Sequence, residues 1–216
     1  MIKVMSPSDW TRENKMKEAV SFDDVLMVPQ YSDIESRSEV NINSDLDVNI
    51  TLHLPVISSP MDTITELAMA QEMSRSGGIG IVHRYNSPRE QAEIIEEAVI
   101  QLVDNPAAAI GITGDFMERA KALVEAGAKV LCVDVAHGHH IMMKNALTKL
   151  KAEFGKQVHI MAGNVATLEA FDALARAGAT SVRVGVGGGS ICSTRIQTGH
   201  GVPTFQSVLE CSSSEE

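Results

Sequence analysis

The sequence predicts an α/β protein of the TIM (β/α)8-barrel type, with about six of the eight strand–helix units present, and three observations support this. Short apolar runs alternate with longer amphipathic segments after residue 50, as strands and helices do around a parallel sheet. The runs recur about every 25 residues, a pitch typical of a barrel of about 250 residues. The junctions "EAGAKV" at 125–130 and "RAGATSV" at 176–182 repeat one helix–glycine–strand pattern. We therefore expect one domain, 1–216, in which 1–50 is a leader.

Each unit pairs a bounded apolar run with an amphipathic segment. The expected strands lie at 55–59, 77–83, 107–112, 130–134, 158–163 and 181–186, and the expected helices at 65–74, 88–102, 115–125, 141–153 and 168–177. Gly178 stands where the C-cap glycine of the last helix is expected. Six strands are too few to close a barrel, so an open doubly wound sheet is the structural alternative. Its usual glycine-rich turn is replaced here by "SSPMD" after the first strand.

The composition excludes several classes of function. The formal net charge is −10, and no basic stripe is present, which disfavours nucleic acid as a partner. No apolar run approaches the length of a membrane span, and the first twenty residues are too polar for a secretory signal, so we expect a cytoplasmic protein. The three cysteines lack the spacing of a zinc site or a disulfide framework.

Polar, titratable or glycine-rich groups follow five of the six expected strands. Ligands of parallel α/β sheets and barrels bind at the carboxyl ends of the strands. The groups found there are Ser58, Ser59, Met61, Asp62, His83, Arg84, Asp134, His137, Gly163, Asn164 and the glycine loop before Cys192. A site assembled from several loops requires such a pattern, which favours an enzyme.

Cys192 is the candidate nucleophile, because it follows the glycine run 187–189 in a loop beside Arg183 and Arg195. A reactive cysteine needs a partly open, electropositive setting that favours its thiolate. The competing interpretation is a small buried hydrophobic residue. Cys132 within "VLCVD" and Cys211 on an expected helix are assigned to the core.

Two further strand-end features have more than one interpretation. The carboxylate of Asp134 is suited to accept hydrogen bonds from ribose hydroxyls, and it is equally suited to cap a helix. The histidines His137, His139 and His140 suggest a metal cluster. No carboxylate or cysteine stands at matching spacing, so a polar loop is the favoured interpretation.

Six motifs in order resemble the IMP dehydrogenase and GMP reductase family. They are "SFDDVLMVPQYS" at 21–32, "PVISSPMDTITE" at 55–66, "GGIGIVHR" at 77–84, "VDVAHGHH" at 133–140, "AGNVAT" at 162–167, and "VRVGVGGGSICSTR" at 182–195 with "TGHGVP" at 198–203. One such motif would be weak, but six over almost the whole chain are specific. The resemblance implies a TIM barrel that carries out a nucleotide reaction at purine C2.

The resemblance also assigns roles to residues. It implies that Cys192 attacks C2 of a purine monophosphate and forms a covalent intermediate while hydride passes to or from a nicotinamide cofactor, with Thr194 helping in catalysis. It places the substrate against Ser59, Met61, Asn164, Arg183 and Ser190, and the cofactor, NAD or NADP, against Asp134, Ala136 and His137. It assigns a potassium ion to the backbone carbonyls of Gly187, Gly189 and Cys192.

The branch of the family is indicated by several residues. "MDTITE", "VDVAHGH" and Arg183 resemble the dehydrogenase, which oxidises IMP to XMP with NAD. The regulatory cystathionine-β-synthase pair of many dehydrogenases is absent between 84 and 107, which resembles the reductase, the enzyme that converts GMP to IMP with NADPH. We favour the dehydrogenase and keep the reductase as the alternative.

The chain ends in "TFQSVLECSSSEE", before the last two strands of the family's barrel. We expect a fragment, or one part of a split enzyme completed by a C-terminal chain. Three classes therefore compete: an active oxidoreductase completed by a second polypeptide or by self-association, a non-catalytic nucleotide-binding module, and a truncation without function. A homo-tetramer is an expectation from the resemblance alone.

Overall fold

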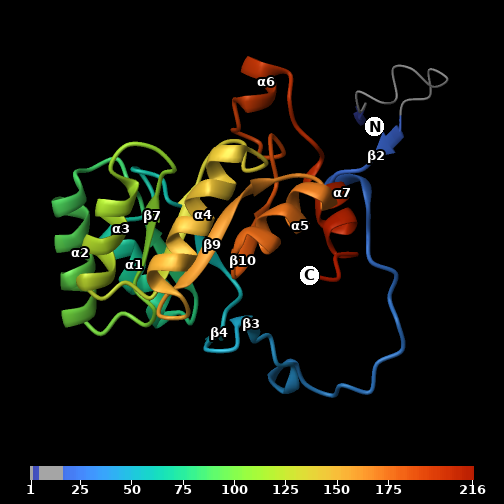
Figure 1. The fold of residues 1–216 in the computed structure, drawn as a ribbon. Helices are drawn as coiled ribbons and strands as arrows, with labels where there is room; N and C mark the ends of the chain where they lie inside the picture. The colour runs from blue at the N-terminus through green and yellow to red at the C-terminus, as the bar shows by residue number, and fades with distance from the viewer. Residues whose placement is uncertain (1, 5–16) are drawn as a thin grey trace.

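The computed structural model describes residues 2–4 and 17–216, and its centre is a curled parallel sheet of six strands (Figure 1). Every strand is hydrogen-bonded to its neighbour in the chain, in the order β10-β9-β8-β7-β6-β5. A doubly wound sheet would reverse its strand order at one point. The unbroken order therefore excludes that alternative and confirms the barrel-type winding. The bounds are β5 Ile57–Ser58, β6 Ile79–Val82, β7 Ala107–Ile110, β8 Val130–Asp134, β9 His159–Val165 and β10 Ser181–Val184.

The helices between the strands cover the outer face of the sheet (Figure 1). Their ends follow the capping signals of the sequence: Ser87 and Glu90 form a capping box before α2, and Thr167 caps α5. Gly178 has φ +112° and ends α5 as expected. The bounds are α1 Leu67–Arg75, α2 Pro88–Ile100, α3 Phe116–Glu125, α4 Ile141–Phe154, α5 Leu168–Ala177, α6 Thr194–Thr198 and α7 Thr204–Cys211.

The strands alternate between two cores with a period of two residues. On β8, Leu131 and Val133 pack outward against the helices, whereas Val130 and Cys132 pack inward. The inner core also contains Ile79, Ile81, Ala107, Ala109 and Met161. Since Asp134 continues the inward series of β8, the alternation directs its side chain toward the barrel axis.

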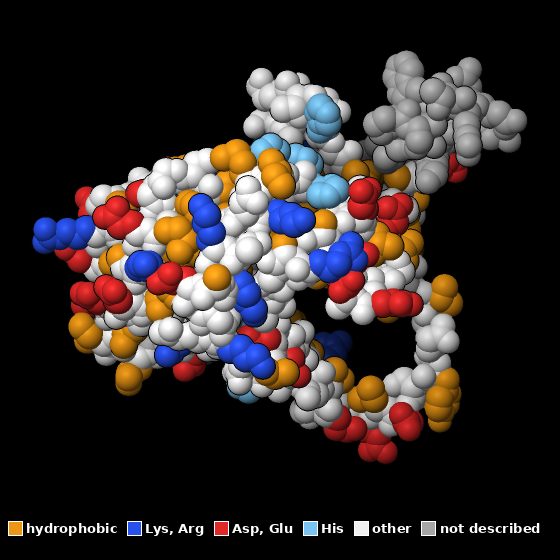
Figure 2. All heavy atoms as spheres, in the orientation of Figure 1, with side chains coloured by type: hydrophobic (Ala, Val, Ile, Leu, Met, Phe, Trp, Pro, Cys, Tyr) orange, Lys and Arg blue, Asp and Glu red, His pale blue; other side chains and the backbone are white. Residues whose placement is uncertain are grey.

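The N-terminal leader contains structure that the sequence did not predict. β1 (Ile2–Val4) pairs with β2 (Lys17–Ala19), and β3 (Ser44–Asp47) pairs with β4 (Ile50–Leu52), both antiparallel. Ile50 and Leu52 are buried in the inner core, so the β3–β4 hairpin covers the amino ends of the sheet strands. Between the two pairs, an extended arm stands away from the sheet (Figures 1 and 2).

Most element boundaries differ from the expectation by one or two residues, and two of these differences have a clear structural cause. The first helix begins at Leu67 rather than at residue 65, because the loop after β5 binds the buried Thr65 hydroxyl. This hydroxyl donates to the Ser59 carbonyl at 2.7 Å and is paired with Ser58 Oγ at 2.8 Å. The last strand ends at Val184 because Gly185, at φ +135°, leaves the extended conformation. In the described part of the chain, no helix is long and apolar enough to cross a membrane.

Candidate active site

The glycine loop after β10 packs closely on the start of α7 and on the segment that precedes it. A Cβ at Gly188 would lie 2.0 Å from the Thr204 hydroxyl oxygen, and one at Gly187 would lie 3.0 Å from the His200 carbonyl oxygen. Gly187 also has φ +76°, a left-handed conformation that side chains disfavour. The glycines are therefore required by close backbone packing, which shapes the loop that leads to Cys192.

Cys192 is half-buried in this loop, and its backbone N–H donates to the Gly189 carbonyl at 3.1 Å. Hydrogen bonds from the hydroxyl and the backbone N–H of Thr194 lower the pKa of the thiol, with smaller contributions from the backbone of Gly187 and the charge of Arg195. A lowered pKa increases the thiolate fraction, and the thiolate is the nucleophilic form. The loop thus presents a thiol whose pKa is lowered by its hydrogen bonds.

Arg183 lies elsewhere, on the inner face of the sheet. Its Nη1 atom is 2.5 Å from Asp134 Oδ1 and 3.5 Å from the Cys132 sulfur. Burial raises the pKa of the Cys132 thiol to about 11, despite the nearby charge of Arg183. Cys132 is fully buried, which fits its assignment to the core.

Gly163 makes the pairing of Asp134 with Arg183 possible. In the strand register, Asp134 on β8 and Arg183 on β10 both stand opposite Gly163 on β9. A Cβ at Gly163 would lie 2.6 Å from the Arg183 Cβ and 2.9 Å from the Arg183 carbonyl oxygen. The glycine leaves a space over the central strand in which the two charged side chains meet.

Asn164 connects the end of β9 to the start of the glycine loop. Its side-chain amide donates to the Gly185 carbonyl at 2.9 Å, while its backbone N–H donates to the Val135 carbonyl at 2.9 Å. These bonds hold the β8, β9 and β10 ends together. Asn164 therefore positions the glycine loop, at the strand end where the sequence predicted a site.

The remaining predicted residues do not line a single cavity. Ser190 lines a cavity of about 580 Å³ together with Gly187 and Arg195, and Ser59 shares an inner cavity of about 170 Å³ with Arg183. Met61 and Cys192 line neither of these two cavities. Met61, Ala136 and His137 are exposed. The structure thus brings Ser59 to Arg183 and Ser190 to the glycine loop, without joining all predicted residues in one pocket.

Sequence reasoning missed several contributors to this end of the sheet. Arg84 was noted only as a strand-end residue, yet its guanidinium lies 3.4 Å from the Asp134 carbonyl, and its Nε is buried without a partner among the described residues. Residues 21–23 of the leader line the cavity of Ser190. The "SFDD" motif indicated that residues 21–23 contribute, but no pattern in the sequence indicated the contact of Arg84. Among the described residues, no group of three His, Cys, Asp or Glu side chains is arranged to hold a metal ion.

A curled, sequentially wound parallel sheet with polar loops at its carboxyl ends defines a TIM-barrel-type protein, a class whose ligands bind at that end. The IMP dehydrogenase / GMP reductase domain model matches residues 19–216. The chain therefore belongs to the IMP dehydrogenase and GMP reductase family.

Individual relatives support the assignment. The chain is 35% identical to an inosine-5'-monophosphate dehydrogenase of Cryptosporidium parvum, over 91% of this chain and 58% of the relative. It is 28% identical to an inosine-5'-monophosphate dehydrogenase of Nitrosopumilus maritimus and 28% identical to a GMP reductase of Leishmania major, over 91% of this chain and 67% of each relative. The chain thus spans about 58 to 67% of the length of these relatives. The Nitrosopumilus alignment extends over 320 positions, more than the 216 residues of this chain, so that relative contains a long insertion.

Proposed function

We propose that this chain carries the nucleophile and part of the nucleotide site of an enzyme that oxidises IMP to XMP with NAD. The observation that supports this most directly is Cys192, a thiol with a lowered pKa in a glycine loop at the carboxyl end of the sheet. The relatives named dehydrogenase reach 35% identity, whereas the named reductase is 28% identical. This difference favours the dehydrogenase direction.

In the proposed reaction, the Cys192 thiolate would add to C2 of the hypoxanthine ring, and a bound nicotinamide ring would supply the acceptor for the hydride on C2. Water would then add at the same carbon and lose a proton to solvent, the C–S bond would break, and XMP and the Cys192 thiolate would be released. The Thr194 hydroxyl stabilises the thiolate before attack and after release, which is the catalytic role we assign to it.

The other residues bind and orient. Ser190 provides a hydroxyl for the phosphate beside the glycine loop, and Ser59 and Met61 contact the nucleotide from the loop after β5. Asn164 holds the loop through Gly185. Asp134, Ala136 and His137 are proposed to face the cofactor. Because Asp134 is bound to Arg183 through Oδ1, its other carboxylate oxygen is the one available to a ribose hydroxyl.

The proposed potassium site fits the described conformation only in part. The Gly187 carbonyl accepts a hydrogen bond from Arg195 Nη1 at 3.2 Å, and the Gly189 carbonyl accepts one from the Cys192 N–H at 3.1 Å. A guanidinium at Gly187 would repel a second cation. Potassium binding by Gly187, Gly189 and Cys192 therefore requires Arg195 to move away.

The proposal includes how the barrel is completed. β5 and β10 each pair with one strand only in the described sheet, so the two remaining strands of a closed barrel would bind along these edges. Further chain beyond residue 216, a complementing polypeptide, or another copy in a homo-oligomer would supply them. We place the complete enzyme in the cytoplasm.

The test is a hydride-transfer assay with IMP and NAD, run beside GMP with NADPH. Appearance of reduced nicotinamide with IMP, lost in Cys192→Ala and retained in the buried-cysteine control Cys211→Ala, is the expected result. Reaction only with GMP and NADPH would favour the reductase. Saturable IMP binding without hydride transfer would favour a binding module, and absence of IMP binding would refute a nucleotide site altogether.

A further inference from the structure

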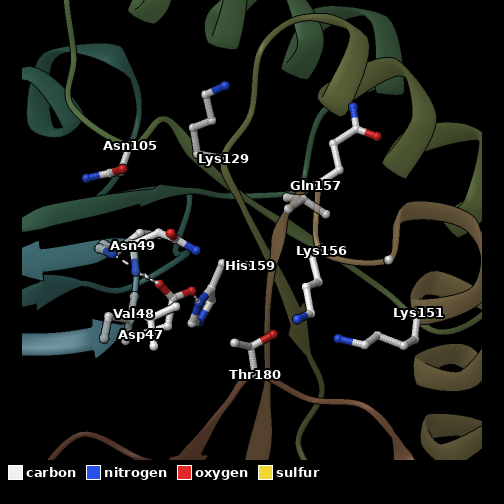
Figure 3. Close-up of a pocket in the computed structure, with 14 residues that line it drawn as sticks. Asp47, Val48, Asn49, Asn105, Lys129, Lys151, Lys156, Gln157, His159 and Thr180 are labelled. Carbon is white, nitrogen blue, oxygen red and sulfur yellow. Dashed lines mark hydrogen bonds and ion pairs between the residues drawn. The ribbon is translucent and has the colours of Figure 1, made fainter.

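A further cavity, of about 670 Å³, is shown in Figure 3. It lies at the amino ends of the sheet strands, opposite the carboxyl ends that lead to Cys192. Its walls are the turn of the β3–β4 hairpin and the segments that precede β8, β9 and β10. Small-molecule sites in proteins usually have volumes of about 300–1,000 Å³. The cavity therefore has the size of a ligand site, and the reaction proposed above does not use it.

Lysines dominate the charge of this cavity. Lys129, Lys151 and Lys156, three of the nine lysines of the chain, line it, and none of them forms an ion pair with any residue in the described ranges. Figure 2 shows that Lys and Arg side chains occupy the middle of the face over α4, whereas many Asp and Glu side chains lie toward its margins. In a chain with a net charge of −10, this concentration of unpaired positive charge is unusual.

The single carboxylate in the lining does not neutralise the lysines. Asp47 accepts hydrogen bonds from the ring of His159 at 2.5 Å and from the backbone N–H of Asn49 at 2.7 Å and of Ile50 at 3.0 Å. The His159 ring is fixed on its other side by the Ser181 hydroxyl at 2.7 Å. Three ammonium groups and one carboxylate leave the lining with a formal charge of +2, and the carboxylate is already engaged.

Two of the lysines converge. In Figure 3 the side chains of Lys151 and Lys156 point toward one another beside Thr180. The stem of Lys151 is held against Gly178, where an added Cβ would lie 3.1 Å from the Lys151 Cβ. A lysine in the last turn of a helix, as Lys151 is in α4, also interacts with the helix carbonyls, but Lys156 lies beyond that helix. Two converging ammonium groups repel each other unless an anion lies between them.

We infer that this cavity binds the phosphate group of a small phosphorylated molecule, with Lys151, Lys156 and the Thr180 hydroxyl as its ligands and Lys129 adding charge. A phosphate accepts hydrogen bonds from ammonium and hydroxyl groups through three oxygens, and lysine binds it as a point charge. Among the described residues, the lining contains no Phe, Tyr or Trp side chain, and the His159 ring is already held between Asp47 and Ser181. The phosphate, rather than a base, is the recognised part.

The test is isothermal titration calorimetry of the protein with inorganic pyrophosphate at low ionic strength. We expect saturable binding that weakens as salt is added, and a Kd about tenfold weaker in Lys151→Gln/Lys156→Gln. The matched control is Lys144→Gln/Lys149→Gln, which removes the same charge from exposed positions of α4 that do not line the cavity. Equal affinity of the two double variants, or no saturation, would overturn the inference.

Two further arms identify the site and the source of the phosphate. Saturating IMP should leave pyrophosphate binding unchanged, because the cavity and Cys192 lie at opposite ends of the strands, whereas competition by IMP would overturn the assignment to this cavity. Ribose 5-phosphate is then titrated. Tighter binding of the sugar phosphate would support an organic phosphate that fills the cavity, and preference for pyrophosphate would support a free inorganic ligand. Unfolding curves of both double variants confirm that they are folded.

Discussion

Replacement of Gly163 by alanine tests the packing that lets Asp134 and Arg183 meet. The new Cβ would lie 2.6 Å from the Arg183 Cβ, 2.9 Å from its carbonyl oxygen and 3.3 Å from its Cα. All three atoms belong to the backbone of β10 or are fixed to it, so the strand itself must shift. Overpacking of this kind costs about 1–3 kcal/mol. Alanine also lowers the entropy of the unfolded chain, which stabilises the folded state by about 0.4–1 kcal/mol. The expected net decrease in the free energy of unfolding is about 1–2 kcal/mol.

The assay is urea unfolding followed by circular dichroism, with Gly111→Ala as the matched control. Gly111 follows β7, two strands away from β9, and an added Cβ there would meet only the Arg84 guanidinium, at 3.6 Å from Nη1 and 3.8 Å from Cζ, which are ordinary contacts. Gly111→Ala should therefore be as stable as the natural chain. Equal midpoints for the two alanine variants would refute the argument that Gly163 is required by the approach of β10.

The remaining predictions concern titratable groups. The rate of Cys192 alkylation by iodoacetamide should rise with pH around a midpoint below the usual pKa of a cysteine, and this midpoint should move upward in Thr194→Val. Cys132 should stay unmodified in the folded protein. Identical pH profiles for the natural chain and the variant would contradict the assigned hydrogen bond. Although burial would raise the pKa of Asp47, its bonds from His159 and the backbone lower it overall. The stability that Asp47 contributes is therefore present above pH 3.8 and lost as the pH falls below it. Asp47→Asn should cost about 1–2 kcal/mol at neutral pH and flatten this acid dependence.

The regular part of the fold could be predicted because each buried strand is a bounded apolar run. All six sheet strands and the five helices between them occur where the sequence placed them. The leader could not be predicted in the same way. β1 to β4 are only three or four residues long, and the β3–β4 hairpin is held by Ile50 and Leu52 against an inner core whose other members come from β6 to β9. No local pattern contains that information.

The sequence predicts which side chains lie at the carboxyl ends of the strands, but it does not predict which of them contact each other. The rule that polar residues gather at the carboxyl ends of parallel strands identified Asp134 and Asn164 as candidates, and the family resemblance added Arg183. Asp134 and Arg183 were assigned to different ligands, yet the structure pairs them with each other. Alternation along each strand predicts which side chains face inward, but their meeting depends on the register of β8, β9 and β10 at Gly163, which a single sequence does not contain.

The contrast between the thiols explains which cysteine is suited to act as the nucleophile. Proximity to arginine is not sufficient, because Cys132 lies 3.5 Å from Arg183 Nη1 and still has a pKa of about 11. There the desolvation of a fully buried thiolate outweighs the attraction of the guanidinium. At Cys192 desolvation is smaller than the hydrogen bonds from Thr194, so these bonds lower the pKa with only a minor contribution from Arg195. Hydrogen-bond donors in an open loop, rather than the nearest positive charge, therefore lower the thiol pKa, and we expect Cys192 to be the more reactive of the two cysteines.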